Sequence, residues 1–341
     1  MLKKISLIAL LVVLSMSLFA QKAELLGAGA TFPYPLYSKM FDEYSKSGAK
    51  VNYQAIGSGG GIKQLIAKTT DFGGTDAIVS ESEGAGMIHI PTCLGAVVVT
   101  YNLPGYSGKP LKMSADIIAD IFMGKITNWN DKRIQALNPG TKIPNLPMTV
   151  VYRSDGSGTT YIFTEYLSKT SKTWKETVGN DKAVKWPVGI GSKGNPGVAG
   201  TIQQTPGSIG YVELIYALSN KMPFADIKNK KGKFITASMA SVSYAANVNM
   251  PADTKVSLTD TDAEKGYPIS SFTWIIVYKK QNYNNRTLAQ ATETLKLIKW
   301  MVTDGQKFAG PLHYAPLPKA AQTKALAQIK AATYNGKPIL K

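Results

Sequence analysis

Three glycine-rich segments that carry hydroxyl side chains stand directly before predicted helices, and they are the parts of the sequence best suited to chemistry. They are residues 27–33, 57–61 and 153–160. The first N–H groups of a helix lack partners within it and carry partial positive charge, so they bind anions. Glycine lets the backbone approach a ligand closely. One such segment is more often an ordinary helix cap, but three together favour a cage for one tetrahedral oxyanion.

One arginine strengthens this interpretation. Arg153 is one of only three arginines in the chain, and it opens the third segment two residues before Asp155. A guanidinium group binds an oxyanion through paired N–H groups in a way that lysine does not match. The alternative is a surface ion pair between Arg153 and Asp155, which would contribute little to the stability of the fold.

Two carboxylates, Asp76 and Asp155, are expected to select among tetrahedral anions. Phosphate still carries a proton near neutral pH, whereas sulfate carries none. A buried carboxylate accepts a hydrogen bond from that proton and repels an anion that lacks one. Asp76 by itself would be explained equally well as a polar residue at a strand end. Taken together with the three glycine-rich segments, Asp76 predicts a preference for phosphate over sulfate.

Strand-like and helix-like patterns alternate along the chain, which indicates an α/β fold with a largely parallel sheet. The helix after the first segment has a predicted apolar face of Leu36, Tyr37, Met40, Phe41 and Tyr44. Loops rich in Pro and Gly are expected at residues 103–109, 138–147 and 186–196. Other predicted strands are residues 51–56, 96–101, 148–152 and 274–278, and the predicted closing helices are residues 289–301 and 320–333.

Residues 1–20 have the pattern of a secretory signal peptide. Lys3 and Lys4 precede an apolar run at residues 5–13, and Ala20 is a small residue at the expected cleavage point. The apolar run is too short for a typical membrane-spanning helix. Cys93 is the single cysteine, so no internal disulfide is possible, and its apolar surroundings predict a buried residue. The mature protein is therefore expected to be soluble outside the cytoplasm, and the resemblance described below implies the periplasm.

The charge of the chain favours an anionic partner but not a nucleic acid. The 39 lysines and arginines exceed the 22 aspartates and glutamates, which gives a formal net charge of +17. The lysines are scattered, and no basic stripe with arginine or aromatic readers is visible. We therefore expect no nucleic-acid partner.

Enzyme chemistry has little support in the residues. His89 and His313 are the only histidines, and neither has a cysteine or carboxylate at metal-ligand spacing. Residues 189–194 match the pattern G-x-G-x-x-G without a strand directly before it, which favours a loop over a dinucleotide site. We expect no catalytic residue, no metal and no cofactor.

Two alternatives stay open. A secreted phosphatase could use Ser58, Ser157 or Thr159 as its nucleophile and Arg153 as a clamp, although no activating base or metal cluster is evident. A carrier of another tetrahedral oxyanion, such as sulfate, would also use such a cage.

Motifs in a fixed order cover nearly the whole chain after the signal peptide. They are Gly27-Ala-Gly-Ala-Thr-Phe-Pro, Val51-Asn-Tyr-Gln with Gly57-Ser-Gly-Gly-Gly, Asp71-Phe-Gly-Gly-Thr-Asp, Leu137-Asn-Pro-Gly, Arg153-Ser-Asp-Gly-Ser-Gly-Thr, Trp186-Pro-Val-Gly, Gly207-Ser-Ile-Gly-Tyr-Val-Glu and Leu312-His-Tyr-Ala-Pro-Leu-Pro.

This set resembles the periplasmic phosphate-binding protein of the ABC-type phosphate transporter. The resemblance implies the type II periplasmic-binding-protein fold, an α/β fold whose two lobes are each a mixed, mostly parallel sheet flanked by helices. Lobe I would comprise residues 24–102 plus 272–341 and lobe II residues 103–271, joined by a two-segment hinge. One departure from the family is Tyr152, since relatives often have a basic residue before the arginine.

The resemblance also implies the function and the ligand contacts. Inorganic phosphate would be bound with high affinity in the interlobe cleft and delivered, by a monomer, to the permease subunits of an inner-membrane ABC transporter. The implied phosphate-binding residues are Thr31, Phe32 (through its main chain), Ser58, Asp76, Arg153, Asp155, Ser157, Gly158 and Thr159.

Overall fold

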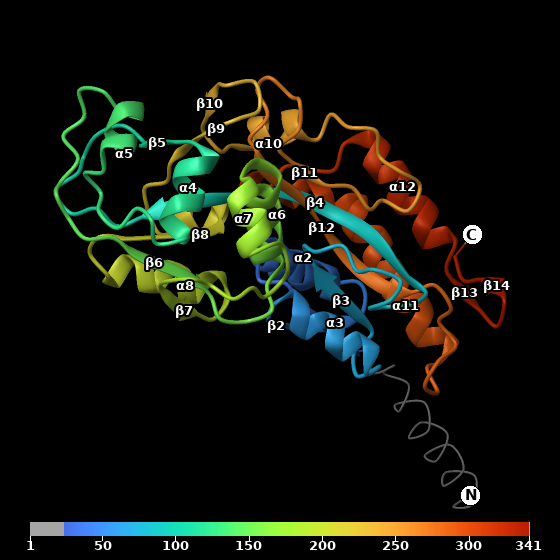
Figure 1. Ribbon diagram of the computed structural model, residues 1–341. Coiled ribbons are helices and arrows are strands. Elements are labelled where there is room, and N and C mark those ends of the chain that lie inside the picture. The colour runs from blue at the N-terminus through green and yellow to red at the C-terminus, as the bar shows by residue number, and fades with distance from the viewer. Residues whose placement is uncertain (1–23, 341) are drawn as a thin grey trace, which may run out of the picture.

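A mixed sheet runs through the computed structural model, which describes residues 24–340 (Figure 1). The predicted signal peptide lies outside the described residues. The strand order is β2-β1-β3-β12-β4-β8-β6-β7, and β11 pairs with β12. The strands are β1 (Glu24–Gly29), β2 (Lys50–Ala55), β3 (Phe72–Thr75), β4 (Met87–Tyr101), β6 (Thr149–Arg153), β7 (Ile190–Ser192), β8 (Ser208–Glu213), β11 (Leu258–Thr259) and β12 (Ile269–Tyr278).

The long strand β4 connects two halves of this sheet. Its residues 87–96 pair with β12, and its residues 97–101 pair with β8. We call β2, β1, β3 and β12 the β1 half, and β8, β6 and β7 the β6 half. The predicted strands at residues 96–101 and 274–278 are the end portions of the longer strands β4 and β12.

The outer strands are parallel and the central strands are antiparallel. Strand β1 pairs in parallel with β2 and β3, and β6 pairs in parallel with β7 and β8. Strand β12 runs antiparallel to both β3 and β4, and β4 runs antiparallel to β8. The fold is thus α/β and two-lobed as expected, with its parallel pairs at the outer parts of the sheet.

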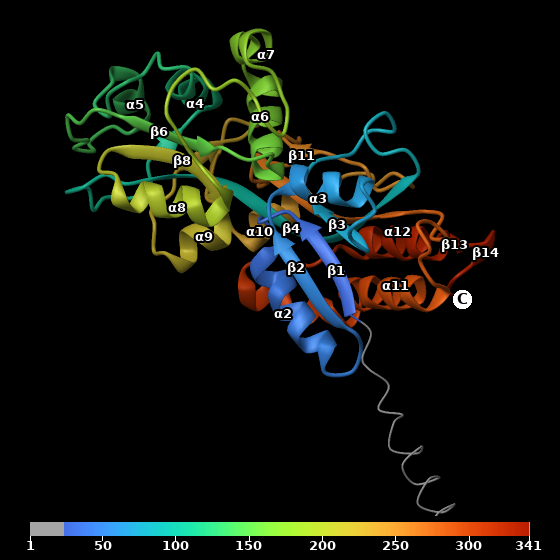
Figure 2. The same ribbon diagram turned by 90° about the horizontal axis from the view of Figure 1, so that it is seen from below.

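Helices flank both halves. Figure 2 shows α8 and α9 beside the strands of the β6 half, and α11 and α12 beside the β1 half, where they contact β4. The helices are α2 (Tyr34–Ser45), α3 (Ser58–Ile66), α4 (Ala115–Phe122), α5 (Lys132–Leu137), α6 (Gly158–Thr170), α7 (Lys172–Thr177), α8 (Gly194–Gln204), α9 (Leu214–Ser219), α10 (Met239–Ala245), α11 (Leu288–Val302) and α12 (Lys319–Lys330). Short strands β5 (Lys112–Met113), β9 (Asp226–Lys228) and β10 (Phe234–Ile235) form a small sheet, and β13 (Thr333–Tyr334) pairs with β14 (Lys337–Pro338).

The three glycine-rich segments each connect a strand to a helix, as predicted. Helices α2, α3 and α6 follow β1, β2 and β6. The predicted apolar face of α2 is buried along its whole length, from Leu36 to Tyr44. Burial of such a stripe against the sheet holds the helix more strongly than propensity does. Each of these three helices therefore begins near the carboxyl end of the strand that precedes it.

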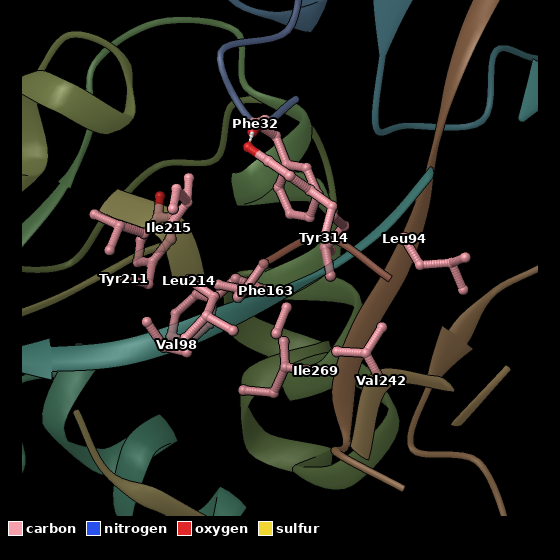
Figure 3. Close-up of a cluster of buried hydrophobic side chains, with 14 of the residues drawn as sticks. Phe32, Leu94, Val98, Phe163, Tyr211, Leu214, Ile215, Val242, Ile269 and Tyr314 are labelled. Atoms are coloured by element: carbon pink, nitrogen blue, oxygen red, sulfur yellow. Dashed lines mark hydrogen bonds between the residues drawn. The ribbon is translucent and has the colours of Figure 1, made fainter. Parts of the chain in front are cut away.

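The two halves share one apolar core. Phe163 of α6 stacks on Tyr211 of β8 with ring centroids 4.4 Å apart, and both belong to the same buried cluster as Phe32 and Tyr314 (Figure 3). The Tyr314 hydroxyl donates a 2.6 Å hydrogen bond to the Phe32 carbonyl. Cys93 is buried in this core, as predicted. His89 lies on β4 and is buried; this burial, aided by the charge of Lys255, lowers its pKa to about 3. Its imidazole is therefore neutral, and Nε2 accepts a hydrogen bond from Val79.

The loop prediction for residues 186–196 is wrong in its second part. Residues 190–192 form β7, and α8 begins at Gly194. The predicted loops at residues 103–109 and 138–147 are confirmed. Between residues 24 and 340, no helix combines the length and the apolar character that crossing a membrane requires.

Candidate oxyanion-binding site

The starts of α3 and α6 face each other across the two halves of the sheet. The main-chain N–H of Gly158 donates to Ser58 Oγ at 3.1 Å. Next to it, the N–H of Gly59 donates to the carbonyl of Gly156 at 2.9 Å. The second and third glycine-rich segments therefore meet at one place, although about 100 residues separate them in the chain.

The start of α2 reaches the same place through Asn195, the second residue of α8. The Asn195 side-chain amide donates to Thr31 Oγ1 at 2.9 Å and to Thr159 Oγ1 at 3.0 Å. Its main-chain N–H also donates to Thr31 Oγ1, at 3.2 Å. A fourth helix start thus joins the three that the sequence predicted.

Arg153 is held by Asp155 in a buried pair rather than at the surface. Nε donates to Asp155 Oδ1 at 2.7 Å and Nη2 to Oδ2 at 2.5 Å, while Nη1 donates to Thr159 Oγ1 at 3.3 Å. The side chains of Arg153 and Asp155 are 1% and 12% exposed. A guanidinium has five N–H groups, so one on each terminal nitrogen is left for a ligand.

Asp155 was expected to help select among tetrahedral anions, but its contacts give it the narrower role of holding Arg153. Its oxygens accept hydrogen bonds from Arg153, and Oδ1 also accepts one from the N–H of Gly194 at 3.0 Å. Burial alone would raise the pKa of Asp155, but the hydrogen bonds and charge of Arg153 lower it overall. Asp155 is therefore an ionised carboxylate that orients the guanidinium.

Asp76 is buried beside Ser58, and its pKa is raised, whereas that of Asp155 is lowered. Oδ1 accepts a 2.7 Å hydrogen bond from Thr273, and Ser58 Oγ donates to Oδ2 over a longer 3.4 Å. Burial raises the pKa of Asp76 to about 7, against the opposing effects of Thr273, Arg153 and Ser58. Oδ2 is the weakly satisfied acceptor at this place, and near neutrality the carboxyl exchanges a proton readily.

Several donors at the helix starts have no hydrogen bond to any described residue. They are the main-chain N–H groups of Phe32, Ser58 and Thr159. Ser157 caps α6, because its Oγ accepts from the N–H of Thr160 at 3.0 Å, and its hydroxyl proton stays available. The arrangement offers many donors and one acceptor, which suits an oxyanion that carries one proton.

Gly158 is needed for this close approach. A Cβ at residue 158 would lie 2.4 Å from both Asp76 Oδ2 and Ser58 Oγ. Gly57 has a φ of 87°, and a Cβ there would lie 2.4 Å from Asp155 Oδ2. Glycine therefore permits the contact between the halves at both positions.

The structure brings the predicted site residues together. Asp155 is the most exposed of them, and the Phe32 ring lies in the core while its main chain lies at the start of α2. The side chains of Thr31, Ser58, Asp76, Arg153, Ser157 and Thr159 belong to residues that are at most 4% exposed. Nowhere in residues 24–340 do three His, Cys, Asp or Glu side chains form a group that could hold a metal ion.

Sequence reasoning missed Asn195. It follows the G-x-G-x-x-G stretch that was interpreted as a loop, and Lys193 at the N-cap makes no side-chain cap. Pro196 in the first turn of α8 was the available signal, since proline is common where a helix begins.

The family comparison agrees with this architecture. Residues 20–304 match the model of the PBP superfamily domain. Phosphate-binding protein PstS of Xylella fastidiosa is 44% identical over 298 residues, which is 86% of this chain and 81% of that protein. PstS of Pasteurella multocida is 42% identical over 331 residues, 94% of this chain and 95% of that protein.

A solved structure with little sequence identity has the same fold. The ancestral soluble variant of the human phosphate binding protein superposes with a TM-score of 0.72 at 19% identity, covering 93% of this chain and 99% of that one. The sequence identity to the PstS relatives extends over most of the chain and, together with the superfamily match, is sufficient to assign the chain to a family. The chain belongs to the PstS family of phosphate-binding proteins within the PBP superfamily.

Proposed function

We propose that this chain binds inorganic phosphate at the meeting point of the four helix starts and delivers it to an ABC transporter. The observation that carries the proposal is the surplus of donors around one available acceptor, Asp76 Oδ2. Monoprotonated phosphate has three oxygens that only accept and one that donates. Its fit to the site is therefore complete, whereas sulfate would leave Asp76 facing an anion without a proton.

The binding-site residues that we propose are the nine implied by the family, with distinct roles. Thr31, Ser157 and Thr159 donate through their hydroxyls, and Ser58 would turn its hydroxyl proton from Asp76 Oδ2 to the ligand. The main-chain N–H groups of Phe32, Ser58 and Thr159 add further donors, and Gly158, whose own N–H is bonded to Ser58 Oγ, gives α6 a start without a side chain. Arg153 contributes two N–H groups, and Asp155 orients them. Asp76 shares one proton with the ligand, because its pKa lies near neutrality.

Such a site is strong enough for tight binding. Hydrogen bonds to charged groups contribute about 1.5–3 kcal/mol each, so about eight of them contribute roughly 12–24 kcal/mol. Lost ligand freedom costs about 4–15 kcal/mol. The difference allows micromolar affinity or better.

Phosphate would enter and leave by movement of the two lobes. We assign lobe I to residues 24–102 plus 272–341 and lobe II to residues 103–271, with β4 and β12 as the connecting strands. The buried site supports a closed state. So does the ion pair that joins the two lobes, in which Lys182 Nζ of lobe II lies 3.1 Å from Glu83 Oε2 of lobe I.

The cellular setting follows from the N-terminal pattern and the family. We propose that residues 1–20 are removed on export and that the mature protein works in the periplasm as a monomer, presenting phosphate to the permease subunits in the inner membrane. Binding without turnover is the proposed activity, so the chain is a carrier and not an enzyme.

Isothermal titration calorimetry with phosphate and with sulfate at pH 7 tests the proposal. Phosphate should bind with a micromolar or lower dissociation constant, and sulfate at least about 10⁴-fold more weakly. Equal affinities would overturn the role of Asp76, and Asp76→Asn should narrow the difference. Turnover of a chromogenic phosphate ester that disappears in Ser157→Ala would instead support a phosphatase.

A further inference from the structure

Asn195 has three polar contacts that together leave only one orientation for its side-chain amide. Oδ1 accepts a 2.9 Å hydrogen bond from the main-chain N–H of Glu213. That group is only a donor, so the atom facing it is the carbonyl oxygen and not the amide nitrogen. Nδ2 must then face Thr31 and Thr159. Asn195 is fully buried, so water does not compete for these contacts.

The amide in turn determines what two hydroxyls can do. Thr31 Oγ1 accepts two hydrogen bonds, both from Asn195. Thr159 Oγ1 also accepts two, one from Asn195 and one from Arg153 Nη1. A hydroxyl has two lone pairs and one proton, so each of these groups has only its proton left to offer. Neither proton is donated to another described residue.

We infer that Asn195 is a positioning residue that commits the hydroxyls of Thr31 and Thr159 to donate to the bound anion. The inference rests on the proposed phosphate site and adds to it a residue outside the nine implied contacts. Without Asn195 each hydroxyl could rotate and present a lone pair to the ligand, which would repel an anionic oxygen. Donors that are oriented before binding need no reorganisation when the anion arrives.

The consequence for the ligand is a restriction on where its proton lies. Oxygens next to Thr31 and Thr159 must be acceptors, so the protonated oxygen of phosphate is directed toward Asp76, which lies beside Ser58. Asn195 and Asp76 would thus act together, from opposite halves of the sheet, to define a single orientation of a monoprotonated anion.

A double-mutant cycle on phosphate affinity tests this role. We expect Asn195→Ala to weaken phosphate binding by roughly 10- to 100-fold, since two charged hydrogen bonds are compromised. In a Thr159→Val background the same change should cost several-fold less, because one of the hydroxyls it orients is already gone. Thr159 is the suitable partner because it and Asn195 lie on α6 and α8, both beside the β6 half, so a role in bridging the halves would not couple them.

A second buried asparagine provides the control for fold stability. Asn138 is 8% exposed and makes three hydrogen bonds to the main chain around Lys112 and Ile134, away from the site. Asn138→Ala should lower the melting temperature and leave the phosphate dissociation constant unchanged.

The outcomes separate the inference from the function on which it rests. If the unmodified protein fails to bind phosphate, the proposed function fails. If it binds but Asn195→Ala has the same affinity, or loses the same factor with and without Thr159→Val, the positioning role is wrong and the function stands. Should Asn195→Ala not fold, Asn195→Ser, which keeps a donor but cannot reach both threonines, is the second variant, with the same cycle expected at smaller amplitude.

Discussion

Asp76→Asn should change how the stability of the ligand-free protein depends on pH. Burial raises the pKa of Asp76 from 3.8 to about 7. Between these values the folded state holds a proton that the unfolded state has lost, so the free energy of unfolding falls as the pH rises. A difference of about three pKa units at about 1.36 kcal/mol each amounts to about 4 kcal/mol. Asparagine has no proton to lose, so the variant lacks this contribution.

The assay is urea unfolding at several pH values between 4 and 8, in buffers without phosphate because a bound anion would stabilise the folded state. We expect the stability of the wild type relative to Asp76→Asn to decrease by about 4 kcal/mol from pH 4 to pH 8. Asp304→Asn, at an exposed position, should show no such trend. A change of less than about 1 kcal/mol for Asp76→Asn would refute the reasoning, because it would mean that the carboxyl is not strongly desolvated.

Three other substitutions test separate parts of the structure. Arg153→Ala should weaken phosphate binding at least about 100-fold, since two charge-assisted hydrogen bonds are lost; calorimetry checks this, with exposed Arg133→Ala as the unaffected control. Gly158→Ala should abolish tight binding, because its Cβ would collide with Asp76 and Ser58, whereas Gly200→Ala, which has open space around it, should bind normally in the same titration. Arg286→Met removes a buried ion pair with Asp71 outside the site and should cost about 3–5 kcal/mol in urea unfolding while the phosphate affinity stays unchanged; a loss of affinity would connect that pair to the site.

Local patterns predicted the helix starts well. The apolar face from Leu36 to Tyr44 and the glycines before Ser58 and Gly158 specify a strand, a turn and a helix within a few residues. Interactions of this short range are visible in a linear sequence. The burial of Cys93 was predictable for the same reason.

Long-range features were harder to predict. The extent of β4 was missed because Pro91 and Gly95 interrupt its apolar run, although both lie within the paired strand. The role of Asp155 depends on Gly57, which closes over it from the other half of the sheet. Asn195 depends on two threonines that lie 36 and 164 residues away. None of these distances can be read from spacing in the chain.

A crystal structure of the protein with phosphate tests the central claim most directly. The account predicts one phosphate between the starts of α2, α3 and α6, with two N–H groups of Arg153 on its oxygens and Asp76 Oδ2 within hydrogen-bond distance of one of them. A phosphate bound elsewhere, or one bound between the helix starts without contact to Arg153 and Asp76, would contradict it.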